Sequence, residues 1–127
     1  MKQIIKTDQA PGAVGPYSQA VAVTSPELLF CARQIPLDPQ TMKLVDGDIS
    51  VQTRQVLNNI KALLEASGSS LDRVVKANVY LLTMSDFAAM NAVYAEFFET
   101  DPPARAAVAV SELPLGCSVE IEVVAYI

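Results

Sequence analysis

Apolar and polar residues alternate in several short stretches of this chain and recur at helical spacing in two longer ones. Alternation with a period of two is typical of a half-buried strand, and recurrence at three and four residues is typical of an amphipathic helix. With the turn residues between them, these patterns predict strands at residues 2–6, 19–24, 28–35, 74–82, 104–111 and 117–127. They predict helices at about residues 50–67 and 85–99.

Each predicted helix carries one apolar stripe, which is expected to face a hydrophobic core. The stripe of the first helix is Val56, Leu57, Ile60, Leu63 and Leu64. Gly68 follows as its stop. Ser85 is the expected N-cap of the second helix, and Pro102-Pro103 lies beyond its end. The stripe of this helix is Phe87, Met90, Tyr94, Phe97 and Phe98.

Two turn segments predict hairpins. Ser25-Pro26-Glu27 separates the second and third strands, and Pro114-Leu115 separates the last two. In the second hairpin Ala109 would lie opposite Glu120, which leaves Arg105 on the order of 13 Å away at ordinary strand rise. We therefore expect that Arg105 and Glu120 of one chain do not touch, and that a site using both forms across a subunit boundary.

The order of strand, hairpin, helix, strand, helix and hairpin predicts an α+β fold, with two helices on one face of a mixed, mostly antiparallel sheet. Residues 1–127 are expected to form a single domain. In the last strand, residues 117, 119, 121, 123, 125 and 127 are all apolar, whereas Glu120 and Glu122 point to the other side. Because the uncovered sheet face also carries apolar residues, we expect other copies of the chain to cover it.

Composition excludes several kinds of chemistry. The chain has no histidine, which removes the common catalytic triads and most zinc sites, and we expect neither a metal nor a cofactor. Cys31 and Cys117 lie far apart and are interpreted as reduced thiols, with a disulfide as the alternative. A formal net charge of −5 argues against nucleic acid as a partner. No membrane-length apolar run or presequence is visible, so the expected location is the cytoplasm, with mitochondria as the alternative.

Charged residues on two predicted strands are the candidates for chemistry. Arg105 is the only charged residue in the segment PPARAAVAVS. Because an arginine offers a planar fork of donors that fits a carboxylate, Arg105 is either a carboxylate anchor or an exposed strand-end residue. Glu120 and Glu122 stand about 6–7 Å apart on one strand face, either as a functional pair or as part of a solvated outer face.

Five separated motifs resemble the RidA family, formerly called YjgF. They are APGAVGPYSQAV, QIPLDP, NVYLLTMSDFAAMNAVYAEFF, PPAR and VEIEVVA, and they span nearly the whole chain. The resemblance implies a chorismate-mutase-like α+β fold assembled as a homotrimer, with three clefts between subunits. It also implies hydrolytic deamination of small, reactive 2-imino acids. These derive from enamines released by pyridoxal-phosphate-dependent dehydratases, which would be the functional partners.

The family's site residues have matching positions in this sequence. The resemblance implies that Arg105 binds the substrate carboxylate and that Glu120 orients the attacking water. It implies that Tyr17 closes the cleft, and it gives Asn91, on the second helix, a less defined role in substrate binding.

Two substrate-contacting positions depart from the family pattern. Ala107 stands where relatives usually have Cys, a position that contacts substrate largely through its backbone. Ala32-Arg33 replaces the usual Ser-Gly. Arg33 can point out of the cleft, fill it, or pair with Glu120 or another acid, and a pair with Glu120 would weaken that carboxylate as a base. Arg33 is therefore expected to control the substrate range.

Three functions follow from these observations. The first is an imine and enamine deaminase. The second is a family member with an altered pocket, which binds small carboxylates or acts like a chaperone. The third is the ribonuclease or translation-inhibitor activity attributed to some relatives, against which the acidic charge and the missing histidine argue.

Overall fold

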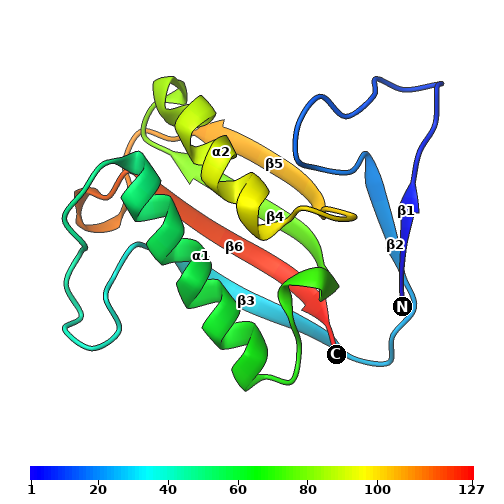
Figure 1. Ribbon diagram of the computed structural model, residues 1–127, viewed down its shortest axis with the longest axis horizontal. Helices are drawn as coiled ribbons and strands as arrows, with labels where there is room; N and C mark the ends of the chain where they lie inside the picture. Colours follow the sequence, from blue (N-terminus) through cyan, green and yellow to red (C-terminus); the bar gives the residue numbers. More distant parts are fainter.

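The computed structural model describes residues 1–127, and its centre is a four-stranded sheet with two α-helices on one face (Figure 1). The elements are β1 Lys2–Ile5, β2 Ala20–Val23, β3 Leu28–Gln34, α1 Ile49–Ala66, β4 Val74–Leu81, α2 Phe87–Phe97, β5 Ala104–Ala109 and β6 Val119–Tyr126. The strand order is β3-β6-β4-β5, with β5 parallel to β4 and the other pairs antiparallel. The expected α+β architecture is confirmed.

Both expected hairpins are wrong. β2 pairs with β1 in a separate two-stranded sheet, and β3 pairs with β6. β5 lies parallel to β4 because α2 supplies the crossover that a parallel pair needs. β6 lies between β3 and β4, so Ala109 faces Leu81 of β4 and Glu120 faces Tyr80. In this central position the apolar face of β6 is fully covered, at Val119, Ile121, Val123 and Ala125.

Most of the predicted stripe residues pack in the core. Leu63 is an exception, because it is 39% exposed and lies outside the core. The first helix begins within one residue of the expected position. The carboxylate of Asp48 caps α1 by accepting a hydrogen bond from the Val51 amide at 3.1 Å. At the other end of α1, Gly68 follows the C-cap residue with a φ of +81°, so the expected stop is confirmed. Ser85 is not the N-cap of α2, because it lies inside a 3₁₀ turn over Met84–Asp86 that precedes the helix.

The hydrophobic core lies between the helices and the sheet. Eight of its 16 residues come from the two helices and the end of α2: Val56, Leu57, Ile60, Leu64, Met90, Val93, Tyr94 and Phe98. The others lie on one face of β4 and β6: Val74, Ala77, Val79, Leu81, Val119, Ile121, Val123 and Ala125. Burial of one large aliphatic side chain contributes about 1.5–3 kcal/mol, so this layer fixes the helices on the sheet.

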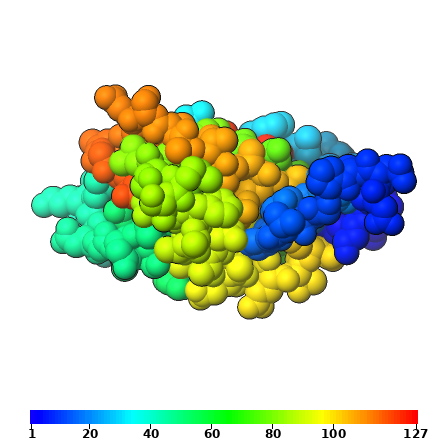
Figure 2. Space-filling model, turned by 90° about the horizontal axis from the view of Figure 1, so that it is seen from above, coloured from blue at the N-terminus to red at the C-terminus, as the bar shows by residue number.

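The other face of the four-stranded sheet, hereafter the open face, carries no helix. Leu28, Phe30 and Val108 lie on it and are 45%, 73% and 48% exposed. The N-terminal strands and the loop between them form a lobe at one end of the molecule (Figure 2). No helix combines the length and the apolar composition that crossing a membrane requires.

Candidate functional site

The sheet register places Arg105 and Glu120 on opposite faces of the sheet. Arg105 lies opposite Ala77, a core residue, so its side chain is on the helix-bearing face. Glu120 lies opposite Tyr80, one position out of phase with the core residues of β4, so its side chain is on the open face. The two residues therefore do not meet within one chain. This expectation holds although the hairpin behind it is wrong.

Arg105 lies in an aromatic pocket beside α2. Its Nη1 donates a hydrogen bond to Oδ1 of Asn91 at 2.6 Å. Its Cζ lies 4.8 Å from the ring centroid of Tyr94, 5.4 Å from that of Tyr17 and 5.5 Å from that of Phe87. The structure thus brings together Arg105, Asn91 and Tyr17, the three residues that the family resemblance places in one site. It adds the rings of Tyr94 and Phe87, which the sequence analysis assigned only to the core.

The local fold explains how these residues converge. The crossover through α2 sets Asn91 above the start of β5, where Arg105 is the second residue. The loop that carries Tyr17 is attached to the same point, because the amide of Ser18 donates to the carbonyl of Pro103 at 3.1 Å. Ala107 follows Arg105 on the same face, and its methyl group packs against the core.

Arg105 is a half-buried cation without an acidic partner. No carboxylate lies within ion-pair distance of it, and the bond to Asn91 is the only hydrogen bond that its side chain makes. Burial lowers the pKa of Arg105, while the nearby Tyr94 and Tyr17 oppose this shift. Most of its donor fork is therefore available to an anion, and a carboxylate fits it best.

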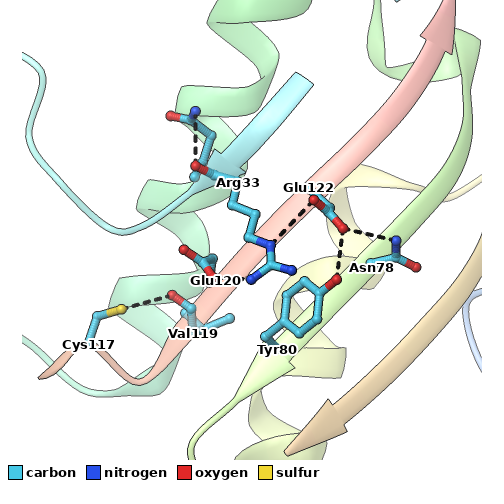
Figure 3. A network of polar contacts seen from close by, with 8 residues as sticks. Arg33, Asn78, Tyr80, Cys117, Val119, Glu120 and Glu122 are labelled. Carbon is cyan, nitrogen blue, oxygen red and sulfur yellow. Dashed lines mark hydrogen bonds and ion pairs between the residues drawn. The ribbon is translucent and has the colours of Figure 1, made fainter. Parts of the chain in front are cut away.

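A second group of polar residues, the open-face cluster, surrounds Arg33 (Figure 3). Nη1 of Arg33 lies 3.6 Å from Oε1 of Glu120, and its Nε lies 3.5 Å from Oε2 of Glu122. Its Cζ lies 4.3 Å from the ring centroid of Tyr80. Of the three alternatives for Arg33, the structure thus favours a pair with Glu120, and Glu122 shares it.

The two carboxylates of this cluster are held differently. Glu122 accepts hydrogen bonds from the Tyr80 hydroxyl at 2.7 Å and from the Asn78 amide at 3.2 Å. The Tyr80 bond is the largest cause that lowers the pKa of Glu122, and burial opposes it. The side chain of Glu120 is only 6% exposed, and its one charged contact is the long pair with Arg33. Glu120 therefore has one loosely held cationic partner, whereas Glu122 has three partners.

Sequence reasoning missed Tyr80 and Asn78 as members of this cluster. Both lie on the polar face of β4, two residues apart, and this alternation was visible in the sequence. The signal became interpretable only with the β4–β6 pairing, because Asn78 lies opposite Glu122 and Tyr80 lies opposite Glu120.

No cavity of the single chain encloses both halves of the candidate site. A cavity of about 510 Å³ lies between the N-terminal strands and the Asp101-Pro102 segment, with Tyr17 in its wall. A groove of about 450 Å³ lies between α1 and residues 33–42, with Arg33 at its edge. Neither is lined by Arg105 or Glu120, and these two candidate residues lie on opposite faces of the sheet.

Comparison with known proteins gives consistent results. Residues 7–127 match the family model described as Endoribonuclease L-PSP. A RutC family protein of Pyrococcus horikoshii is 56% identical over 126 residues, which cover 99% of this chain and 98% of that protein. The crystal structure of RidA from an Antarctic Psychrobacter species is 49% identical, covers 98% of this chain and 99% of its own, and has a TM-score of 0.77. The structure of TdcF from E. coli with bound serine is 38% identical, covers 98% of both chains and has a TM-score of 0.76. With the motifs and the fold, these matches show that the chain belongs to the RidA (YjgF) family.

Proposed function

We propose that the protein hydrolyses 2-imino acids to 2-oxo acids and ammonia, in a site that two copies of the chain form together. The observation that carries this proposal is Arg105, a half-buried cation that has aromatic neighbours, one amide partner and no carboxylate. TdcF, a relative, was crystallised with serine, which carries the carboxylate that such an arginine would bind.

The positions of Arg105 and Glu120 support association of several copies of the chain. Arg105 and Glu120 cannot contact one small substrate within a chain, because they lie on opposite faces of the sheet. The open face also exposes Phe30 by 73% and Val108 by 48%. A homotrimer would cover these side chains and would form three equivalent clefts, each with Arg105 from one copy and Glu120 from the next.

In the proposed reaction, Arg105 binds the substrate carboxylate with its donor fork, and Asn91 orients the guanidinium. Tyr17 covers the bound acid with its ring. An imine carbon is already electrophilic, so the main requirement is a positioned water. Glu120 accepts a proton as the water oxygen bonds to C2 and passes this proton to the imine nitrogen, which gives a neutral carbinolamine. Glu120 then takes the proton of the carbinolamine hydroxyl and delivers it to the amino nitrogen as the C–N bond breaks, so that ammonia and the 2-oxo acid leave and Glu120 is again ionised.

The test follows imine loss during a dehydratase reaction on serine or threonine. We expect the parent protein to accelerate formation of the 2-oxo acid. Arg105→Ala should lose roughly 2–4 kcal/mol of transition-state stabilisation, which lowers kcat/KM about 30- to 1000-fold. Arg54→Ala is the matched control, because Arg54 is an exposed arginine that pairs with Glu96 on the helices. Equal rates for the parent and Arg105→Ala would sink the proposal.

The Arg33–Glu120 contact favours a second candidate, a small-carboxylate-binding protein without turnover. In that case the parent would bind pyruvate in calorimetry through Arg105 and would leave the imine reaction unchanged. RNA cleavage, which the family description names, can be followed with the same variants on a labelled RNA.

A further inference from the structure

We propose that Arg33 is a specificity-determining residue that makes 2-imino dicarboxylic acids the preferred substrates, by exchanging its pair with Glu120 for the second carboxylate of the substrate. This inference rests on the proposed imine hydrolysis and names the substrate class of the same site. Three observations support it: the position of Arg33 on the open face, its long distances to both glutamates, and the hydrogen bonds that Glu122 has and Glu120 lacks.

A β-bulge directs Arg33 to the open face. Cys31 and Gln34 lie opposite Val123 and Ile121, so β3 has one residue more than β6 between these two pairs. A bulge of this kind turns a side chain away from the face that strict alternation would give it. Without the extra residue Arg33 would share the buried side of Cys31; with it, the guanidinium lies among the carboxylates.

The contacts of Arg33 are suited to exchange. Its distances of 3.5 and 3.6 Å to the two glutamates exceed the roughly 2.7–2.9 Å of a tight charge-assisted hydrogen bond. The Arg33 side chain is 53% exposed, so its outer edge can receive another anion while its flat face stays on Tyr80. Arg33 is thus the exposed member of a pair whose other member, Glu120, is only 6% exposed, and its long contacts leave donor positions open to a second anion.

The exchange would release Glu120 and leave Glu122 in place. Glu122 keeps its hydrogen bonds from Tyr80 and Asn78 when Arg33 turns to another partner. Glu120 has no such bonds, and Arg33 is its only charged contact. A second carboxylate on Arg33 therefore frees the proton acceptor that the proposed hydrolysis uses.

Monocarboxylic and dicarboxylic imino acids would make different contacts in this site. A monocarboxylic imino acid pairs with Arg105 and gains nothing from Arg33, which stays on Glu120 and shields it. A dicarboxylic imino acid of four or five carbons can pair with Arg105 at one end and with Arg33 at the other. Without Arg33, the second carboxylate would face Glu120 and Glu122 and be repelled.

The experiment compares kcat/KM for 2-iminobutanedioate and 2-iminopropanoate, both generated in place by an amino-acid oxidase. We expect the parent to prefer the dicarboxylic substrate by about tenfold or more, which one charge-assisted contact can supply. Arg33→Gln removes the charge and keeps a shorter polar side chain. It should lower the rate on the dicarboxylic substrate about 10- to 100-fold and raise the rate on 2-iminopropanoate. Arg54→Gln changes the same charge far from the cluster and should keep the ratio of the parent.

A second readout separates this inference from the reaction itself. Calorimetry with butanedioate and propanoate, which do not react, measures whether Arg33 binds a second carboxylate. An unchanged substrate ratio in Arg33→Gln overturns the role of Arg33 while imine hydrolysis stands. If the parent hydrolyses neither substrate, the proposed function fails. Loss of butanedioate affinity in Arg33→Gln would then keep Arg33 as the anchor for a second carboxylate, and equal affinity would overturn that role too.

Discussion

At the scale of single residues, Glu120 and Glu122 differ in their partners although they lie two positions apart on β6. Glu122 is held by a phenol and an amide from β4, whereas the only charged contact of Glu120 is Arg33 at 3.6 Å. A carboxylate that accepts hydrogen bonds from neutral donors is stabilised in its ionised form, and here these bonds link β6 to β4. The one with a weak partner can accept a proton during a reaction.

The pH dependence of stability should report on Glu122. Its folded-state pKa is lowered, first by the Tyr80 hydrogen bond and then by Asn78 and Arg33. A lowered pKa contributes stability above the unfolded value of about 4.3, and this contribution is lost as the pH falls through the folded value. Glu122→Gln should therefore reduce the free energy of unfolding by about 1 kcal/mol at pH 7, a modest figure because the side chain is 29% exposed.

Urea denaturation of the parent and Glu122→Gln at pH 7, 5 and 3 would measure this contribution. The gap between the two proteins should shrink as the pH falls from 7 to 3, because protonation of Glu122 removes the charge that its partners stabilise. A gap of the same size at all three pH values would show that Glu122 acts by packing alone.

The resemblance to the family sufficed to name Arg105, Asn91 and Tyr17, and these residues do gather in one place. The pair of Arg33 with Glu120 was one of three alternatives, and the sequence could not choose between them. A bulge changes the face of the sheet to which a side chain points. The segment Cys31-Ala32-Arg33 contains no glycine, so the sequence gives no sign of the bulge there.

At the scale of elements, periodicity was enough to find every strand and both helices, with boundaries that shift by a few residues. The turn residues did not predict which strands are neighbours in the sheet. The segment at residues 110–118 looks like a hairpin turn, yet it carries the chain past β4 so that β6 lies on the other side. Local turn chemistry fixes a change of direction, whereas burial of the apolar face of β6 decides the neighbour.

The loop before α1 depends on one glycine. Gly47 has a φ of +148°, and a Cβ at this position would lie 2.6 Å from the Cβ of Val51 in the first turn of the helix. Gly47→Ala should therefore displace the turn that Asp48 caps and destabilise the fold by about 1–3 kcal/mol. Thermal unfolding should show a midpoint lowered by several degrees. Gly12→Ala is the control, because nothing lies within 4 Å of its Cβ position; equal midpoints for both variants would contradict the packing argument.

At the scale of the whole molecule, the open face should be an interface. Light scattering at micromolar concentration should give about three times the mass of one chain. Phe30→Asp, which places a charge at a position 73% exposed in the single chain, should lower this mass and the imine-hydrolysing activity together. A stable monomer that hydrolyses imines would remove the shared site.

The positions of Arg105 and Glu120 on opposite faces have a genetic consequence. An Arg105→Ala chain keeps an intact Glu120, and a Glu120→Gln chain keeps an intact Arg105. In the proposed trimer, each variant alone would form only defective clefts. When the two are refolded or expressed together, a mixed trimer would contain one cleft in which both contributing residues are wild type, so about a third of its sites should recover. Two inactive alleles should therefore complement each other in a cell, which no pair of lesions in a self-contained active site can do.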